Sequence, residues 1–189
     1  MSSFETFADG GIIVARQMFD PALVDAFATE ANELLERGRG NYYFTTGEKS
    51  PSLVQSKALD YANFSGHVAV TKVVAGIMGP LAPTSRLVIN RQAPHAFQRF
   101  HPDFHVKAIA MLHGNGGGAF DFVEHDVNPN PYERDDDQMG IITEYAPNDF
   151  INITLDAGDV VFQLDTGIIH RGRNLSDKPR ITGAMYTSL

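Results

Sequence analysis

The feature that most constrains the fold is a change in hydrophobic period after Pro83. Beyond this residue, apolar and polar side chains alternate with a period of two over short segments, which is the pattern of half-buried strands. Glycine, proline, asparagine and aspartate separate these segments at short intervals. The expected strands cover residues 86–92, 96–103, 106–113, 118–124, 150–155, 159–164, 168–170 and 181–187. Such a series of short strands predicts a jelly-roll barrel or sandwich.

The helical patterns lie before these strands. Asp20 and Pro21 supply an N-cap and a proline at the first helical position, after a short apolar strand, so we expect a helix that ends near residue 37. A second helix is expected over residues 66–78, where valines recur at helical spacing before a Gly-Pro pair. The segment 38–63 between them has a weak pattern and is interpreted as loop.

The whole chain is expected to form one domain. Its 189 residues are enough for a substantial core and too few for two domains of ordinary size. We therefore assign residues 1–189 to a single, mainly β domain. It is expected to contain a helical cap region over about residues 1–83 and a jelly-roll core over about residues 84–189. The N-terminal helices are expected to pack on one sheet of this core.

Charge and composition narrow the classes of partner. The net charge of -8 argues against a nucleic-acid binder, so a small-molecule partner is expected. The sequence contains no cysteine, so any metal ion must be bound by nitrogen and oxygen atoms. Without a long apolar run or a signal-like N-terminus, a cytoplasmic protein with no membrane partner is expected. The oligomeric state stays open.

One short segment places a carboxylate and two imidazoles within five residues. Because strand side chains alternate, we expect His101, Asp103 and His105 on one face and Phe100 on the other. A histidine and a carboxylate two residues apart can bind one metal ion. With a second, distant histidine they form the two-His-one-carboxylate face of non-haem Fe(II) oxygenases. His170 is the candidate for this distant ligand.

The other pieces of the candidate site lie in the C-terminal part. A turn at Gly158 precedes a buried strand, and a later glycine returns the chain so that His170 lies on the neighbouring strand. In a small barrel this arrangement brings His170 against the strand of His101. Ten residues after His170, Arg180 and Thr182 alternate onto one face of the last expected strand. A guanidinium suits bidentate capture of a carboxylate, and a nearby hydroxyl can donate a further hydrogen bond.

Taken together, these pieces resemble the Fe(II)/2-oxoglutarate-dependent oxygenase superfamily. The motifs that carry the resemblance are, in chain order, His101-x-Asp103, the strand-bounded glycines at 116–118, His170 and Arg180-x-Thr182. Residues 9–15 and 19–24 look like the opening of the phytanoyl-CoA dioxygenase-like branch. The resemblance covers residues 9–37 and 86–188.

The resemblance implies a double-stranded β-helix, the cupin-like form of the jelly roll, in which His101, Asp103 and His170 bind Fe(II). It implies that Arg180, helped by Thr182, holds the far carboxylate of the co-substrate 2-oxoglutarate. In that superfamily 2-oxoglutarate chelates the iron through its keto-acid end and O2 takes the remaining position. Decarboxylation to succinate then yields a ferryl species that abstracts hydrogen from the substrate.

Two finer points follow from the same resemblance. Relatives often carry a further co-substrate contact on an earlier strand, and the matching position here is Asn90 or Gln92. Relatives that halogenate typically have glycine or alanine at the carboxylate position, so Asp103 favours hydroxylation, desaturation or ring closure. His105 has no role in the superfamily pattern, and Gly172 stands where phytanoyl-type members often have serine.

Two other functions stay open. Residues 158–174 come close to the second cupin motif, so a cupin-type metal-dependent dioxygenase or isomerase without 2-oxoglutarate is one alternative. The first cupin motif needs H-x-H with a downstream glutamate, which His101-x-Asp103 does not supply. The other alternative is a non-catalytic jelly-roll binding module whose histidines are structural.

The expected substrate is a small molecule, either an amino acid or a specialised metabolite, that the protein hydroxylates. Arg99 shares the metal-facing side of its strand, and Tyr186 shares the pocket-facing side of the last strand. Tyr42, Tyr43 and the long segment 126–149 are candidates to close over the pocket. A basic Arg99 favours a substrate carboxylate, whereas the acidic run in the long segment favours an amine. The two together fit an amino acid.

Overall fold

A computed structural model of the protein describes residues 3–37, 41–45, 48–54, 76, 87–98, 100–103, 106–113, 117–124 and 145–186. Within these ranges the chain is mainly β, as the sequence predicts, and forms one named α-helix. The elements are β1 (Ser3–Phe7), η1 (Ala8–Gly10), β2 (Ile12–Arg16), α1 (Pro21–Glu36), β3 (Asn41–Thr45), β4 (Glu48–Val54), β5 (Leu87–Gln92), β6 (Lys107–His113), β7 (Gly118–Phe122), β8 (Ile151–Leu155), β9 (Val160–Gln163), β10 (His170–Asn174) and β11 (Arg180–Tyr186).

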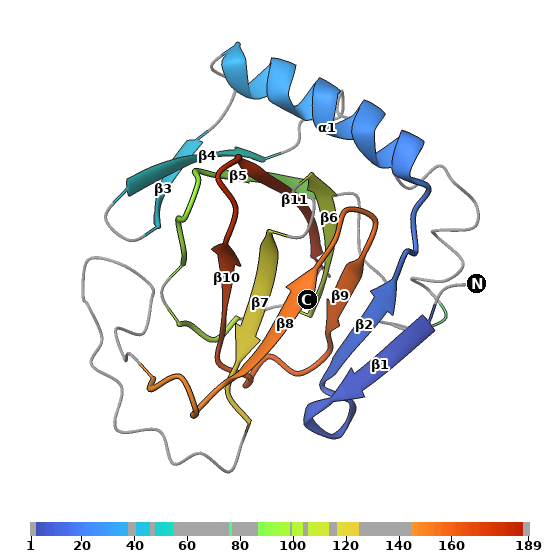
Figure 1. Ribbon diagram of the computed structural model, residues 1–189, viewed down its shortest axis with the longest axis vertical. Helices are drawn as coiled ribbons and strands as arrows, with labels where there is room; N and C mark the ends of the chain where they lie inside the picture. The colour runs from blue at the N-terminus through green and yellow to red at the C-terminus, as the bar shows by residue number, and fades with distance from the viewer. Residues whose placement is uncertain are drawn as a thin grey trace.

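The strands form two antiparallel sheets (Figure 1). The larger sheet has the order β1-β2-β9-β6-β11-β5-β4-β3, and the smaller has the order β10-β7-β8. Strands far apart in the sequence are neighbours, since β2 pairs with β9, and β11 pairs with both β5 and β6. This interleaving of N-terminal and C-terminal strands in two facing sheets is a jelly-roll arrangement.

The period-two alternation of the strands accounts for the core between the sheets. Ile12 and Val14 on β2 and Val161 on β9 point toward the smaller sheet. There they pack against Phe120 and Ile153 in a fully buried cluster. The alternating residues of β2 and β9 point to the opposite face of the larger sheet, where a second apolar layer forms.

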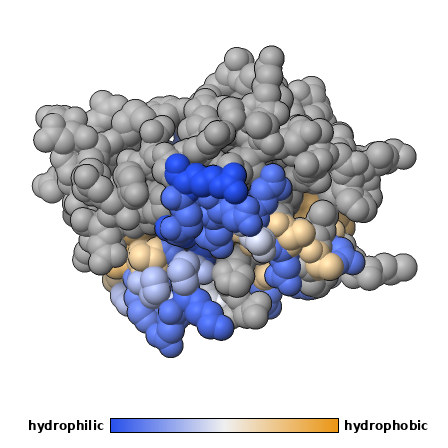
Figure 2. Space-filling model, turned by 90° about the horizontal axis from the view of Figure 1, so that it is seen from above, coloured by the Kyte–Doolittle hydropathy of each residue, from blue (hydrophilic) through white to orange (hydrophobic). Residues whose placement is uncertain are grey.

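Helix α1 begins where the sequence predicts. The side chain of Asp20 accepts a hydrogen bond from the backbone of Ala22 at 2.8 Å, and Pro21 is the first helical residue. The buried residues of α1 share one cluster with residues of the larger sheet: Val24, Ala28, Ala31 and Leu35 with Ala15, Val106, Ala108, Val160, Phe162 and Ile181. The solvent side of α1 carries exposed polar residues such as Glu30. Seen from above, the molecule has hydrophilic residues in the middle of this face (Figure 2).

Residues 96–103 do not form the regular strand that the sequence predicts. In the described part of this segment, the pairing consists of isolated bridges, one of which joins His101 to His170. Pro102 lacks an N–H group and therefore cannot continue a hydrogen-bonded ladder. The bridge still places the two histidines directly opposite each other, because each backbone N–H donates to the other residue's carbonyl at 3.0 Å.

Two other local predictions were wrong. The interpretation of 38–63 as loop fails for β3 and β4, which pair with each other before β4 pairs with β5. Pairing with a strand distant in the sequence stabilises this hairpin, and a local pattern does not contain that information. The short strand expected at 168–170 instead begins at His170 and continues to Asn174, because its register is set by β7. Strand β1 was not predicted at all.

The predictions of a second helix, a helical cap region and a single domain can be compared with the structure only in part, because the structure describes only part of the chain. The second expected helix, 66–78, lies outside the described residues except for Gly76, which is helical. Strands β1 to β4 precede residue 84 and belong to the larger sheet, so the expected cap region also supplies strands to the core. The single-domain organisation stays a prediction. Among the described helices, none is long and apolar enough to span a membrane.

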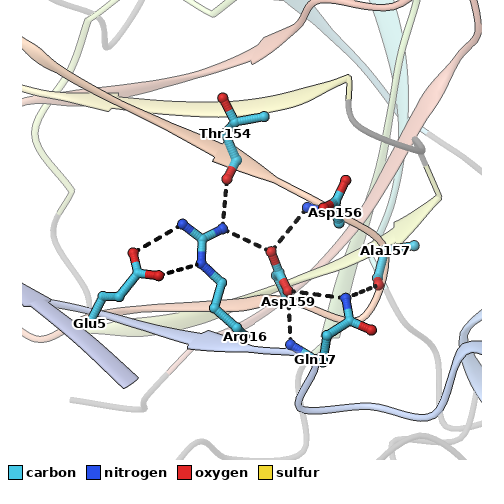
Figure 3. A network of polar contacts seen from close by, with 7 residues as sticks. All are labelled: Glu5, Arg16, Gln17, Thr154, Asp156, Ala157 and Asp159. Atoms are coloured by element: carbon cyan, nitrogen blue, oxygen red, sulfur yellow. Dashed lines mark hydrogen bonds and ion pairs between the residues drawn. The ribbon is translucent and has the colours of Figure 1, made fainter. Parts of the chain in front are cut away.

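A network of hydrogen bonds and ion pairs connects the hairpin of β1 and β2 to the turn between β8 and β9 (Figure 3). Asp159 is only 2% exposed, and its carboxylate accepts hydrogen bonds from the backbone of Gln17 at 2.9 Å and of Asp156 at 3.0 Å. The guanidinium of Arg16 donates to the same carboxylate at 3.0 Å and to Glu5 at 2.9 Å. A single buried carboxylate therefore satisfies donors from two distant parts of the chain.

Asp159→Ala is expected to lower the free energy of unfolding by about 2 to 3 kcal/mol, because it leaves buried donors unpaired. Urea denaturation followed by circular dichroism measures the change. Glu5→Gln is the matched control, since the Glu5 side chain is 42% exposed and an exposed ion pair contributes about 1 kcal/mol or less. Equal losses in the two variants would contradict the importance of the buried carboxylate.

Candidate functional site

A polar pocket lies between the two sheets. Its walls come from β5, β6 and β11 of the larger sheet, from β7 and β10 of the smaller sheet, and from the segment before β6. Alternation along each strand turns every second residue into this pocket. The lining residues are Asn90, Gln92, Gln98, His101, Asp103, Lys107, Ile109, Phe120, His170, Gly172, Arg180, Thr182 and Ala184.

The three metal-ligand candidates from the sequence come together in this pocket. One ligand atom from each of His101, Asp103 and His170 lies within 4.8 Å of the others. The two imidazole rings have centroids 4.6 Å apart, and the ring of Phe120 stacks on His170 at 5.2 Å. Two imidazoles and one carboxylate, brought together from distant parts of the chain, form a donor set suited to a first-row transition metal.

His170 is held in the form that binds metal. Burial, and then the neighbouring Lys107 ammonium, lower the pKa of His170, so its ring is neutral. Its Nδ1 atom lies 3.0 Å from the carbonyl oxygen of Ile168, which accepts the ring proton. The lone pair is therefore on Nε2, the atom that faces the pocket. Metal-binding histidines characteristically donate their other ring N–H to such a partner.

Lys107 lies between two of the candidate ligands. Its ammonium forms an ion pair with the carboxylate of Asp103 and lies 3.1 Å from Nε2 of His170. Burial by itself raises the pKa of Asp103, yet that pKa lies well below its usual range, and the nearby positive charge of the Lys107 ammonium lowers it. The Asp103 carboxylate is therefore ionised.

These contacts test whether the site suits a cation. An Asp103 oxygen and Nε2 of His170 are 3.1 Å apart, and both are electron-pair donors. Two such atoms repel each other unless a positive group lies close to both, and Lys107 is that group. The ligand set thus already binds a positive charge in the pocket, so the residues present fit a metal ion.

Arg180, the first residue of β11, reaches into the same pocket. It is 3% exposed, and its Nη1 donates to the side chain of Gln92 at 3.0 Å and to the carbonyl oxygens of Ala119 and Arg173 at 3.2 Å and 2.7 Å. Thr182, two residues further along β11, lines the pocket as well. The guanidinium is therefore fixed in position by two strands of the smaller sheet and one of the larger.

The register between β5 and β11 relates the remaining co-substrate candidates. Gln92 is paired with Arg180, and Asn90 is paired with Thr182. The Gln92 side chain accepts from Arg180 at 3.0 Å and donates to the carbonyl of Gly172 at 3.3 Å. Gln92 therefore orients the guanidinium, whereas Asn90 lines the pocket beside Thr182.

Gly172 makes room for this guanidinium. A Cβ atom built on Gly172 would lie 3.0 Å from Nη1 of Arg180 and 3.0 Å from the Gln98 side-chain oxygen. Gln98 also accepts a hydrogen bond from the backbone N–H of Gly172 at 3.0 Å. Glycine at this position therefore allows Arg180 and Gln98 to approach β10 closely.

Residues next to the ligands face away from the pocket and support it. Phe100 packs in a small apolar cluster on the other side, as alternation predicts. Arg171, beside His170, forms an ion pair with the buried Asp121 at 2.7 Å and lies 4.3 Å from the centroid of the Phe100 ring. These contacts link the segment of His101 to β10 on its outer side.

Several residues predicted to contact the substrate, or their side chains, lie outside the described part of the chain. Arg99, His105 and residues 126–144 of the long segment lie outside the described residues. Tyr42 and Tyr43 belong to β3, and Tyr186 ends β11, but their side chains lie outside the described part of the chain. The residues expected to contact substrate thus stay predictions.

Sequence reasoning missed Lys107 and Gln98. A signal for Lys107 was present, because a lysine occupies an inward position of the otherwise apolar run Val106 to Leu112. A charged residue at such a position needs a buried partner. Gln98 carried no comparable signal, since its contact with Gly172 depends on two segments that are distant in the sequence.

No protein-family model and no curated protein sequence matches the chain. Solved structures do match it. The epimerase SnoN, in complex with Fe3+, alpha-ketoglutarate and nogalamycin RO, gives a TM-score of 0.70 at 17% identity, over 94% of this chain and 79% of SnoN. The prolyl-4-hydroxylase of Pseudomonas putida gives a TM-score of 0.66 at 15% identity, over 95% of this chain and 93% of that enzyme. HygX of Streptomyces hygroscopicus, with nickel and 2-oxoglutarate bound, gives a TM-score of 0.65 at 16% identity, over 94% of this chain and 82% of HygX.

These likenesses establish the fold. The chain folds as the iron- and 2-oxoglutarate-dependent enzymes do, with the mainly β jelly-roll architecture that the sequence predicts. The match to SnoN includes nearly the whole of this chain and most of that enzyme.

Proposed function

We propose that the protein is a non-haem Fe(II)/2-oxoglutarate-dependent oxygenase that acts on a small molecule. The observation that carries this proposal is the combination of one pocket, three convergent ligands and one buried arginine. His101, Asp103 and His170 lie together in the pocket that Arg180 also lines. A metal site alone fits many activities, whereas a metal site with a fixed guanidinium fits a co-substrate that carries a carboxylate.

The ligand residues have defined tasks in this function. His101, Asp103 and His170 would hold Fe(II) on one face and leave the other coordination positions for co-substrate and O2. When bound, the iron supplies the activation of O2, with 2-oxoglutarate as the electron donor. The hydrogen bond from Nδ1 of His170 to Ile168 orients the ring so that Nε2 stays directed at the metal position.

The co-substrate residues lie further along the pocket. Arg180 binds the far carboxylate of 2-oxoglutarate, and the hydroxyl of Thr182 donates a further hydrogen bond to it. Gln92 keeps the guanidinium in place, and Asn90 provides the additional polar contact on β5. The buried, apolar side chain of Phe120 lines the same pocket, where its ring stacks on His170.

The reaction type is proposed to be hydroxylation of an amino acid or a specialised metabolite. Asp103 keeps a carboxylate in the ligand set, which favours hydroxylation over halogenation. SnoN is an epimerase and the Pseudomonas putida enzyme is a prolyl-4-hydroxylase, so this fold supports more than one outcome. The proposal also includes the phytanoyl-CoA dioxygenase-like branch, because residues 9–15 and 19–24 resemble the opening of its members.

Turnover of the co-substrate tests the proposal and separates it from its two alternatives. With Fe(II), O2 and 2-oxoglutarate, we expect succinate to form faster than in an Asp103→Ala control, even without the true substrate. A cupin-type enzyme would bind metal but form no succinate from 2-oxoglutarate. A non-catalytic module would neither bind metal tightly nor consume O2. Succinate formation at the rate of the control would contradict the proposal.

Gly172→Ala is expected to weaken 2-oxoglutarate binding about tenfold, because the new methyl group displaces Arg180 by a few tenths of an ångström. Isothermal titration of the metal-loaded protein measures this affinity. Gly76→Ala is the control, since a Cβ atom there meets no heavy atom within 4 Å. Unchanged affinity in Gly172→Ala would contradict the role assigned to the close approach of Arg180.

A further inference from the structure

Among the charged groups described in the pocket, Lys107 is the one to which the proposed function gives no task. It is 5% exposed and projects from β6 into the pocket. Its ammonium contacts Asp103 and lies 3.1 Å from Nε2 of His170, two of the three assigned metal ligands. Lys107 therefore competes with a metal ion for the same two donor atoms.

The metal ion and the ammonium cannot share these donors, because both are cations. Asp103 is the sole carboxylate among the described residues that line the pocket. When a metal binds Asp103 and His170, Lys107 loses its ion pair, while its backbone remains part of β6. A buried ammonium without an anionic partner is strongly unfavourable. Lys107 then needs another anion within reach.

The co-substrate of the proposed function is such an anion. Lys107 lies opposite Tyr186 at one end of β11, and Arg180 lies at the other end of the same strand. Both side chains line one pocket, Lys107 beside the metal-ligand candidates and Arg180 beside Gln92, so the pocket holds two separate cationic groups. 2-Oxoglutarate carries a carboxylate at each end, which matches this distribution of charge.

We propose that Lys107 exchanges partners: it binds the metal ligands in the metal-free protein and the metal-end carboxylate of 2-oxoglutarate in the loaded protein. This inference rests on the proposed function and assigns a positioning role to one further residue. Metal alone must displace the ammonium, and the co-substrate then gives the ammonium a new ion pair. Each ligand therefore raises the affinity for the other, by the same factor in both directions.

Two binding measurements on Lys107→Met test the exchange. This substitution removes the charge and keeps a side chain of similar length. Competition with a chromophoric chelator gives the Zn(II) affinity of the metal-free protein, with and without 2-oxoglutarate. Calorimetry gives the 2-oxoglutarate affinity of the Zn(II)-loaded protein. Zn(II) has no redox chemistry, so neither readout depends on turnover. Lys178→Met, which changes an exposed lysine, is the matched control.

The two affinities are expected to change in opposite directions. Lys107→Met should bind Zn(II) alone about tenfold more tightly than wild type, because no ammonium has to be displaced. The Zn(II)-loaded variant should bind 2-oxoglutarate about tenfold more weakly, because one ion pair is missing. The factor by which 2-oxoglutarate raises the Zn(II) affinity should fall accordingly. Lys178→Met should behave as wild type in every titration.

A purely structural role for Lys107 would weaken both ligands together. An unchanged or weaker Zn(II) affinity in Lys107→Met overturns the inference, and so does an unchanged 2-oxoglutarate affinity. Lys107→Gln provides the same comparison if the methionine variant does not fold. If the Zn(II)-loaded wild type binds no 2-oxoglutarate, the proposed function and the second half of the exchange both fail. The Zn(II) titration then still decides whether Lys107 competes with metal.

Discussion

Asp103→Ala is expected to lower the affinity for Fe(II) by at least about a hundredfold, the upper range for loss of a residue that merely supports a ligand. The substitution removes the sole carboxylate among the described pocket residues and leaves two imidazoles beside the Lys107 ammonium. That ammonium then repels a metal ion without any compensating negative charge. Anaerobic competition with a chromophoric Fe(II) chelator measures the loss.

Glu124→Ala is the matched control for this prediction, because it removes an exposed carboxylate that follows β7. Its Fe(II) affinity should equal that of wild type. An Asp103→Ala protein that binds Fe(II) as tightly as wild type would contradict the ligand assignment. His170→Ala is expected to cause a comparable loss, since it removes the buried imidazole whose Nε2 faces the same position.

Arg180→Met is expected to weaken 2-oxoglutarate binding by about a hundredfold or more while leaving metal affinity unchanged. Loss of one partner from a buried charge pair typically has an effect of this size. The guanidinium is 3% exposed and fixed by three acceptors, so little reorganisation precedes its contact with a carboxylate. Calorimetric titration of the metal-loaded protein measures the change.

Arg91→Met supplies the control for Arg180. Arg91 is a neighbour on β5, but it points to the opposite face of the sheet, where it pairs with Glu36 of α1 at 2.6 Å. Its replacement should leave 2-oxoglutarate binding unaltered. Loss of metal and co-substrate binding together in Arg180→Met would indicate general damage to the pocket rather than loss of a carboxylate partner.

The parts of the fold that could be predicted from the sequence are those with strong local patterns. Asp20 and Pro21 mark the start of α1 because capping is local chemistry. The continuous apolar run of β9 indicates burial on both faces, and in the structure Val161 packs between the sheets while Phe162 shares a cluster with residues of α1. The hairpin of β3 and β4 was missed because its stability depends on β5, which is distant in the sequence.

The candidate site likewise has residues that the sequence could indicate and contacts that it could not. Residue type and spacing were enough to choose His101, Asp103 and His170 as candidate ligands, and the structure brings these three residues together. The contacts of Lys107 and Gly172 could not be predicted, because each joins strands that meet only in the folded protein. A sequence pattern shows that a residue points inward, but not which residue lies opposite it.

Anaerobic titration of the Fe(II)-loaded protein with 2-oxoglutarate examines iron and co-substrate in a single experiment. Chelation of the iron by the keto acid produces a weak metal-to-ligand charge-transfer band near the green. We expect this band to grow and saturate in wild type, and Arg180→Met to need about a hundredfold more 2-oxoglutarate for the same intensity. A wild-type protein that binds Fe(II) but develops no such band at any 2-oxoglutarate concentration would contradict the proposed function.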